Sequence, residues 1–445
     1  MTKPNILFLF PDQHRGDWLP FGQEVWNEPG IESLPIQMPN LQKLMQRGTT
    51  FTKAITPSPL CAPARACLAS GLRYHRCGVE GNHDNYPLEQ RTFYSVLKEQ
   101  GYNVGGVGKF DLHKASHWWG LDGWIDELGT LGFTHGVDNA GKIDAIVSGR
   151  EEPKDPYMQF LYERGLADIH LKDMTGRGNS TLQTELPDDA YCDNWLSQNG
   201  VRLLREFQQD QPWFMVVNFT GPHNPWDVTQ SMKERWKDIP FPLPVGSELD
   251  PAEITEIRQN YAAMLENIDR NVGMLLAEVE ARGEIDRTVI IYASDHGEML
   301  GDYNKFGKTR PERASVHIPL VISGPGILEH VHSEALVELQ DLAGTIVELA
   351  GGTMEEAKDS ASLVPILMGK HVAHRPYQIS ALSKIKNNGS TWISISDGQY
   401  KLIVSGEQDK RLYSVISDPW ETENIASVEE ETVTRLENAL RDEIR

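Results

Sequence analysis

Short apolar runs, each followed by polar or charged residues, constrain the fold of this 445-residue chain more than any other feature. The runs are rich in β-branched and aromatic residues and have the length of buried strands. They occupy residues 6–10, 103–107, 213–219, 288–292 and 318–322. Patterns with helical spacing lie between them, and the clearest runs from Tyr261 to Val279 before Gly283. Alternating strands and helices predict an α/β fold, with a mainly parallel central sheet and helices on both faces.

The chain is longer than the ~250–300 residues at which a single core stops growing, so we expect two units. We predict a large α/β domain over residues 1–368 and a small C-terminal α+β subdomain over residues 369–445. Strand-like runs at 392–396 and 401–404 predict a short antiparallel sheet in that subdomain. Residues from about 114 to 188 lack a regular pattern. They predict an insertion that shapes the substrate side of the large domain.

The composition excludes several classes of protein. A net charge of −22 argues against nucleic-acid binding. No apolar run is long enough to span a bilayer, and the N-terminus leads directly into a strand-length run. A cytoplasmic location is therefore expected, or a periplasmic one if a leader has been removed. Four cysteines in a chain of this size do not form a disulfide framework, and free buried thiols are expected.

Polar residues follow two of the predicted strands, at the edge of an open α/β sheet where ligands bind. Asp12 and Gln13 follow the first strand, and Asp295 and His296 follow the strand at 288–292. Two carboxylates, an amide oxygen and an imidazole can hold one divalent cation. Oxygen ligands favour calcium, whereas imidazole suits manganese or zinc better. The sequence thus predicts a metal site and leaves the identity of its metal open.

The segment that runs from Cys61 to Arg65 reads Cys-x-Pro-x-Arg, and it resembles the signature of the formylglycine-dependent (type I) sulfatases of the alkaline phosphatase superfamily. Other segments resemble that family in the same order, and the resemblance extends from Asn5 to Ala426. They are Gly108-Lys109, Pro222-His223, Asp295-His296-Gly297-Glu298, Gly307-Lys308, Pro319-Leu320, Pro325-Gly326 and Asp418-Pro419.

The resemblance implies an alkaline-phosphatase-like catalytic domain and a modified nucleophile. In the family the cysteine is oxidised to formylglycine by a formylglycine-generating or anaerobic sulfatase-maturating enzyme, so Cys61 is expected to carry an aldehyde. It would join Asp12, Gln13, Asp295 and His296 in holding a divalent metal. The family usually uses Ca²⁺, and Mn²⁺ is the alternative here because His296 stands where many members have Asn.

The resemblance also assigns roles to single residues. Arg65 would orient the hydrated aldehyde, Lys109 and Lys308 would bind sulfate oxygens, and His223 would protonate the leaving alcohol. The family has a Gly-Lys-x-His segment, but here Asp111 takes the histidine position. His113, two residues later, is expected to deprotonate the second hydroxyl of the aldehyde hydrate, provided that its loop presents it there.

The leading hypothesis is a sulfuric ester hydrolase that acts on a small sulfated substrate. Among such substrates, the sequence favours a sulfated mono- or oligosaccharide. One alternative is a formylglycine-dependent phosphonate monoester or phosphodiester hydrolase. Another is an inactive binding protein with the same fold, for which Asp111 is the only hint. Further residues are expected to line the pocket or to stack on sugar rings: His14, Arg15, Asp17, Trp18, Asn82, His83, Asp84, Trp118, Trp119 and Trp124.

Overall fold

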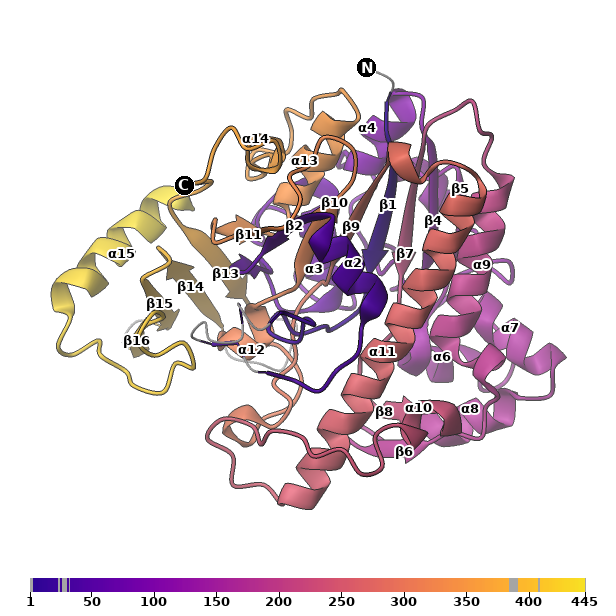
Figure 1. The fold of residues 1–445 in the computed structure, drawn as a ribbon, viewed down its shortest axis with the longest axis horizontal. Coiled ribbons are helices and arrows are strands. Elements are labelled where there is room, and N and C mark those ends of the chain that lie inside the picture. The colour runs from indigo at the N-terminus through magenta and orange to yellow at the C-terminus, as the bar shows by residue number, and fades with distance from the viewer. Residues whose placement is uncertain are drawn as a thin grey trace.

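A computed structural model describes residues 3–22, 25, 30, 31, 33–383, 391–406 and 409–444. Figure 1 shows a large sheet flanked by helices, with a small sheet and a helix beside it. This arrangement confirms the α/β fold and the small C-terminal subdomain that the sequence predicts. Within the described part of the chain, no helix is long and apolar enough to cross a membrane.

The central sheet has eight strands among the described residues, in the order β11-β2-β10-β9-β1-β7-β4-β5. Their bounds are Val331–Ser333, Gly48–Phe51, Leu320–Ser323, Thr288–Ala293, Asn5–Phe10, Trp213–Asn218, Asn103–Gly108 and His135–Asp138. The five strands from β9 to β5 pair in parallel, whereas β10 runs antiparallel to both of its neighbours. The carboxyl ends of β9, β1, β7 and β4 therefore open at one edge of the sheet.

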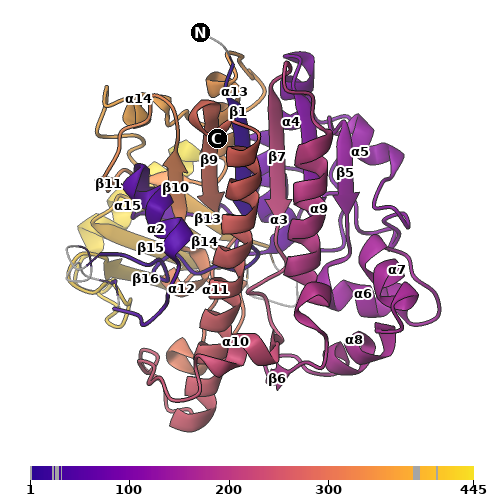
Figure 2. The ribbon, with the colours of Figure 1, turned by 45° about the vertical axis from the view of Figure 1, so that its right-hand side comes forward.

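Alternate side chains of β1 enter two different apolar cores, one on each face of the sheet, because successive side chains of a strand point to opposite faces. Leu7 and Leu9 belong to the core beneath α2, α9 and α11, whereas Ile6, Phe8 and Phe10 belong to the core beneath α3, α4 and α13. Figure 2 shows α9 and α11 side by side over one face. These helices span Pro39–Gln46 (α2), Cys61–Ser70 (α3), Phe93–Glu99 (α4), Cys192–Glu206 (α9), Pro251–Ala281 (α11) and Asp341–Leu349 (α13).

The region expected to be an insertion contributes one strand to the main sheet. β5, at His135–Asp138, pairs with β4 and forms the edge of the sheet. The prediction of one continuous insertion from 114 to 188 is therefore wrong at this strand, which is too short and glycine-containing to give a strand pattern. The other elements of the region are α5 (Asp126–Thr130), α6 (Gly141–Gly149), α7 (Pro156–Glu163), α8 (Ala167–Met174) and β6 (Thr181–Gln183).

The C-terminal part of the chain forms a four-stranded antiparallel sheet covered by α15 (Glu430–Glu443). Its strands are β13 (Gln378–Leu382), β14 (Trp392–Ser396), β15 (Tyr400–Ser405) and β16 (Asp409–Ser414). The domain boundary at residue 369 stays a prediction. The remaining short elements are β3 (Ala54–Ile55), β8 (Trp226–Val228), α10 (Gln230–Glu234), α12 (Arg313–Val316), β12 (Val337–Glu338) and α14 (Val364–Leu367).

The small sheet supports a loop of the large domain. The indole of Trp392 donates to the carbonyl of Thr309 at 3.0 Å, and the ammonium of Lys401 donates to the carbonyl of Pro311 at 2.5 Å. Lys401 is also paired with the buried Glu421 at 2.6 Å. The loop between Phe306 and Pro311 is therefore held from behind by residues that lie about 80 to 90 positions later in the chain.

The helix α3 follows directly from its sequence. All ten of its residues are buried, and four are alanines, which pack closely and favour a helix. Pro63 lies in the first turn, where a missing N–H costs nothing. Gly71 ends the helix with φ 69°, in the left-handed region that glycine adopts at helix ends. Cys61 is thus the first residue of the helix, at its positive end.

Three buried histidines make the fold sensitive to acid. Burial lowers the pKa of His170 to about 4, the pKa of His14 to about 4 and the pKa of His317 to about 3. In the unfolded chain a histidine titrates near 6.5. As the pH falls below this value, the unfolded chain takes up protons that the folded chain does not. Stability present at neutral pH is therefore lost between about pH 6.5 and pH 4.

We predict that His170→Gln reduces this loss. His170 has a pKa of about 4 in the folded chain, whereas a histidine of the unfolded chain has a pKa near 6.5. Between pH 7 and pH 5, this difference lowers the free energy of unfolding by about 2 kcal/mol. Urea unfolding at both pH values should therefore show a pH dependence weaker than wild type by that amount. The exposed His371→Gln serves as the control and should keep the full dependence. A His170→Gln variant with the wild-type dependence would contradict the assignment.

Candidate active site

Residues that follow two strands meet the first residue of α3 in one buried cluster. Asp12 follows β1, Asp295 and His296 follow β9, and Cys61 begins α3. One ligand atom from each of these four residues lies within 4.8 Å of the others, and all four residues are buried. The structure thus assembles a set of donor atoms for a cation from positions that are far apart in the sequence.

Gln13, which the sequence predicts to be a further ligand, contacts the cluster through its backbone. It has φ 72°, and its backbone N–H donates to Asp295 Oδ1 at 2.9 Å. Its side-chain amide nitrogen donates to Glu298. The amide oxygen Oε1 is buried and has no hydrogen-bond partner among the described residues. A buried acceptor without a donor is costly, and a cation beside Asp12 would satisfy it.

The donor chemistry of the cluster fits a divalent metal. Carboxylate and amide oxygens suit Ca²⁺, Mg²⁺ and Mn²⁺, and one imidazole is compatible with Mn²⁺. Burial opposes protonation of His296, but the carboxylate of Asp295 dominates and raises its pKa above the ordinary value. The carboxylate of Asp295 thus favours positive charge next to it, in keeping with a cation site.

Arg65 connects the cluster to the ends of four strands. Its guanidinium is 3.1 Å from Asp295 Oδ2 and 3.5 Å from Asp12 Oδ2. It also donates to the carbonyl of Lys109 at 2.6 Å and to Asn218 Oδ1 at 3.0 Å. Burial alone would lower the pKa of Arg65, but Asp295 and Asp12 raise it above its ordinary value, so it stays charged. It lies one helical turn after Cys61, as predicted.

Two lysines bring positive charge to position 61. Lys308 Nζ lies 2.8 Å from Cys61 Sγ, and Lys109 Nζ lies 2.5 Å from Asp12 Oδ2. Burial and Asp12 oppose ionisation of the thiol, but Lys109, Lys308 and His296 outweigh them and hold the pKa of Cys61 well below its ordinary value. Burial also opposes ionisation of Asp12, yet Lys109 and Lys308 hold its pKa well below the usual range. The surroundings of Cys61 therefore favour a negative group at that position.

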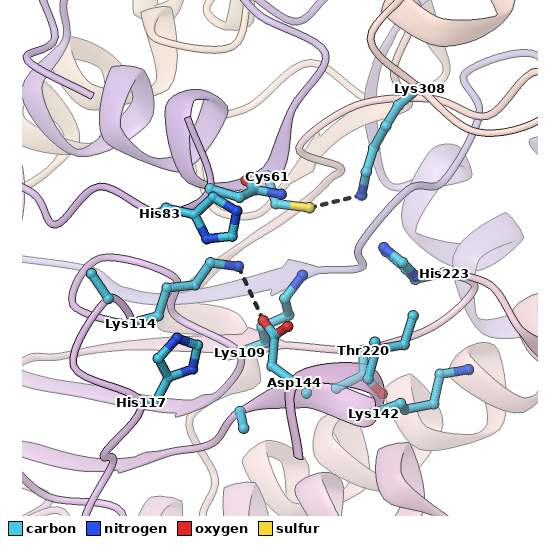
Figure 3. Close-up of a pocket in the computed structure, with 15 residues that line it drawn as sticks. Cys61, His83, Lys109, Lys114, His117, Lys142, Asp144, Thr220, His223 and Lys308 are labelled. Atoms are coloured by element: carbon cyan, nitrogen blue, oxygen red, sulfur yellow. Dashed lines mark hydrogen bonds and ion pairs between the residues drawn. The ribbon is translucent and has the colours of Figure 1, made fainter. Parts of the chain in front are cut away.

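His223 lies in the turn that follows β7. Its Nδ1 is 2.5 Å from the carbonyl oxygen of Asn224, which fixes one side of the ring, and the residue lines the same pocket as Cys61. In Figure 3, His223 and Lys308 lie on one side of the pocket. An imidazole held by one nitrogen at the edge of a pocket can exchange a proton with a bound molecule through the other.

His113 does not reach the pocket, which corrects the sequence expectation. The chain turns at Asp111, which has φ 55°, and the Asp111 carboxylate pairs with Lys109 at 3.2 Å and with Lys114 at 3.3 Å. Two residues later, His113 Nε2 lies 3.6 Å from Glu127, and His113 is not among the residues that line the pocket. Asp111 thus occupies the histidine position with an ion pair, and the loop carries His113 away.

The pocket above Cys61 is a cavity of about 240 Å³ with a basic lining (Figure 3). Sequence reasoning missed several of its residues, because they lie in the irregular region after β4 or in a turn without a recognisable pattern. Its charged, polar and histidine side chains are Cys61, Asn82, His83, Lys109, Lys114, His117, Lys142, Asp144, Thr220, His223 and Lys308.

Other residues expected at the pocket have structural roles. Arg15 is buried and pairs with Asp17 at 2.6 Å and with Asp302 at 2.7 Å. His14 is held between Tyr292 and the carbonyl of Trp18. Asp84 accepts from the backbone of Glu80 and Gly81 in its own loop. None of the three tryptophans at 118, 119 and 124 lines the cavity, and Trp119 is fully buried. Asn82 and His83 do line it, as expected.

The four cysteines are free and buried, in agreement with the sequence analysis. Burial, together with its neighbour Cys77, raises the pKa of Cys67 well above the ordinary value. Burial and Asp193 do the same for Cys192. Cys61 therefore differs from these two thiols in the direction of its pKa shift.

Comparisons with known proteins show the family of the chain. The Sulfatase family model matches residues 4–352, and a model described as N-sulphoglucosamine sulphohydrolase, C-terminal, matches residues 301–445. A choline-sulfatase from Rhizobium meliloti (strain 1021) is 27% identical over 452 residues, which cover 95% of this chain and 82% of that protein.

Two solved structures share the fold over nearly the whole chain. One is a protein in complex with its substrate D-glucosamine-2-N,6-O-disulfate, with a TM-score of 0.77, 19% identity and coverage of 99% of this chain and 98% of that one. The other is a phosphonate monoester hydrolase of Agrobacterium radiobacter, with a TM-score of 0.79, 22% identity and coverage of 99% and 94%. Because the Sulfatase model matches most of the chain, the protein belongs to the formylglycine-dependent sulfatase family of the alkaline phosphatase superfamily and hydrolyses sulfate esters.

Proposed function

We propose that this sulfatase removes sulfate from a small sulfated carbohydrate, with formylglycine at position 61 as the nucleophile. The observation that carries the proposal is the placement of Cys61 beneath a basic cavity, 2.8 Å from the ammonium of Lys308. The cavity of about 240 Å³ lies below the roughly 300–1,000 Å³ of pockets for drug-sized ligands. It therefore suits a sulfate group with one sugar ring rather than a long chain.

The charge distribution supports a small anionic substrate. The chain carries a net charge of −22, yet four lysines and one aspartate are the charged residues that line the cavity, apart from histidine. A long polyanion would meet the acidic surface, whereas a small sulfate ester can reach the locally basic cavity. The complex of the structural neighbour with a sulfated glucosamine is in line with a sugar substrate.

The residues present suggest the order of proton and bond changes. One hydroxyl of the hydrated aldehyde at position 61 releases its proton to solvent, and its oxygen bonds to sulfur while the bond between sulfur and the substrate oxygen breaks. His223 gives its proton to that substrate oxygen, so that a neutral alcohol leaves. The second hydroxyl then releases its proton to solvent, the carbon–oxygen bond to sulfate breaks, and the aldehyde re-forms as sulfate departs. Water hydrates the aldehyde again, and His223 regains its proton from solvent. Lys109 and Lys308 hold the sulfate oxygens, and Arg65 holds the helix that carries residue 61. Because His113 lies outside the pocket, it has no part in this proposal.

We assign Ca²⁺ to the cluster of Asp12, Gln13, Asp295, His296 and residue 61, with Mn²⁺ as the alternative. Oxygen donors outnumber the single imidazole, which supports the calcium assignment. A bound divalent cation would lower the pKa of the nucleophilic hydroxyl and polarise a sulfate oxygen. The proposal also requires a formylglycine-generating or anaerobic sulfatase-maturating enzyme as a partner.

We predict that Cys61→Ser abolishes turnover while the fold persists. A serine can be sulfated but lacks the second hydroxyl that expels sulfate, so kcat should fall by at least about 10³-fold. Sulfate release from a panel of sulfated mono- and oligosaccharides measures this, with formylglycine content checked by mass spectrometry. Cys77→Ser is the control, since a hydroxyl can keep the contacts of Cys77 with the Tyr74 and Val79 carbonyls.

The same panel separates the sulfatase from its alternative. It should include an aryl phosphonate and an aryl phosphodiester beside the sulfated sugars and an aryl sulfate. Higher kcat/KM on the phosphonate or the diester than on every sulfate ester, by protein shown to carry the aldehyde, would refute the proposed substrate class.

We predict that His223→Gln affects substrates according to their leaving group. A general acid contributes about 10²–10⁴-fold where the leaving alcohol is poor, as in a sugar sulfate. An aryl sulfate with an acidic phenol needs little protonation and should lose much less. Measured kcat values on both substrates test this, and an equal loss on both would remove His223 from the role of general acid.

We predict that removal of the metal stops turnover reversibly. Dialysis against EDTA should abolish sulfate release, because the two carboxylates and the nucleophile then lose their shared cation. Ca²⁺ should restore the activity, and Mn²⁺ added alone to the same apoprotein is the comparison. Full restoration by Mn²⁺ and none by Ca²⁺ would reverse the metal assignment, and full activity in EDTA would contradict the metal site itself.

A further inference from the structure

The wall of the cavity opposite Lys308 and His223 carries one lysine and two histidines that the proposed sulfate hydrolysis does not use. Figure 3 shows His83, Lys114 and His117 on this side, with Lys114 joined to Asp144. Lys114 is only 7% exposed and lines the cavity. None of these four residues contacts Cys61 in the hydrogen bonds and ion pairs of the described chain. They form a second polar group in the same cavity.

The loop that carries Lys114 is fixed in place by its neighbours. The backbone N–H of Ala115 donates to Asn85 Oδ1 at 2.9 Å, and the N–H of Tyr86 donates to the carbonyl of Leu112 at 2.7 Å. The N–H of His117 closes a turn on the carbonyl of Lys114 at 3.0 Å. A binding group held by such contacts loses little freedom when a ligand arrives.

The ammonium of Lys114 has a donor to spare. It contacts Asp111 Oδ2 at 3.3 Å and Asp144 Oδ2 at 3.2 Å, which uses two of its three N–H donors. Asp111 Oδ2 also serves Lys109, at 3.2 Å, so one carboxylate oxygen is divided between two ammonium groups. The Asp144 side chain is 35% exposed and belongs to α6, at the cavity wall. Lys114 therefore keeps one N–H donor that neither carboxylate uses.

The rest of the lining favours an anion over a cation at this place. Of the described residues that line the cavity, Asp144 is the only acid, and it is already paired. Lys142 is less available than Lys114, because its ammonium forms a short pair of 2.5 Å with Asp227, in which both side chains are buried, whereas the partner of Lys114, Asp144, is 35% exposed. Lys114 is then the ammonium that remains available on this wall.

We propose that Lys114, flanked by His83 and His117, forms a second anion-binding subsite, and that the preferred substrate carries a second negative group besides the sulfate that is cleaved. This inference rests on the proposed function and narrows its substrate class. The second group is a sulfate or a carboxylate on the same sugar ring. Asp144 holds Lys114 toward the cavity and is the group with which the substrate anion competes.

The test compares three sugars that differ only in the second group. One carries a single sulfate and no other charge, the second carries two sulfates, and the third is a sulfated uronic acid. Wild-type enzyme loaded with metal should show kcat/KM about tenfold or more higher on a doubly charged sugar, the gain expected from one charge-assisted hydrogen bond. The arm that shows the gain identifies the second group as sulfate or carboxylate. Equal kcat/KM on all three sugars would overturn the subsite.

Substitutions of Lys114 and Asp144 should change the preference for doubly charged sugars in opposite directions. Lys114→Gln should remove the preference for the doubly charged sugars, mainly through a higher KM for them. It should keep the turnover of the sugar that carries a single sulfate. Asp144→Asn should strengthen the preference, because Lys114 loses its competing carboxylate. Lys172→Gln neutralises an exposed lysine of α8 and is the matched control, which should leave all values unchanged. An equal loss on all three sugars in Lys114→Gln would show a structural role only.

A binding measurement keeps this test separate from the proposed activity. Calorimetric titration of the Cys61→Ala variant with the same sugars reports affinity without turnover, and the preference should appear there as well. If wild type releases sulfate from none of the sugars, the proposed function fails, while the titration still decides the subsite. If Lys114→Gln does not fold, Lys114→Arg should keep the preference and Asp144→Asn should raise it.

Discussion

The contact between the Arg65 guanidinium and the ends of four strands is the one on which the rest of the site depends. One buried cation binds groups at the carboxyl ends of β1, β9, β4 and β7, namely Asp12, Asp295, the Lys109 carbonyl and Asn218. Without it, two buried carboxylates would face each other with less compensation, which is strongly destabilising in a protein interior. Because Arg65 lies one turn after Cys61, the same contact fixes residue 61 relative to the ends of the strands.

Around this contact, positive and negative groups are shared rather than paired one to one. Asp12 serves Arg65, Lys109 and Lys308, and Asp111 serves Lys109 and Lys114. The carboxylates of Asp111 and Asp12 outweigh burial and raise the pKa of Lys109 above its ordinary value, and Asp111 and Asp144 do the same for Lys114. Such sharing reconciles a strongly acidic chain with a pocket that binds anions. The net charge of −22 disfavours the approach of a large polyanion, which agrees with the small sulfated substrate that we propose for the basic cavity.

The sequence predicts the parts of the site that depend on strand ends. Asp12, Gln13, Lys109, Asp295 and His296 come directly after apolar runs, and parallel strands bring such positions together whatever the loops do. His113 could not be placed, because its direction depends on the backbone of Asp111, a local turn that no periodicity reveals.

The second wall of the cavity was also beyond sequence reasoning. The pair of Lys114 and Asp144 joins a loop to α6, and β5 lies between them in the chain. Only tertiary packing determines that contact.

The packing around Cys61 also affects when its thiol is accessible. Cys61 is about 1% exposed in the folded chain, and the loop with Lys308 above it is supported by Trp392 and Lys401. About 380 residues follow Cys61, which takes on the order of 20–80 s to synthesise. The oxidation that we propose for this thiol would therefore meet least obstruction on the growing chain, before the C-terminal sheet supports the loop that carries Lys308.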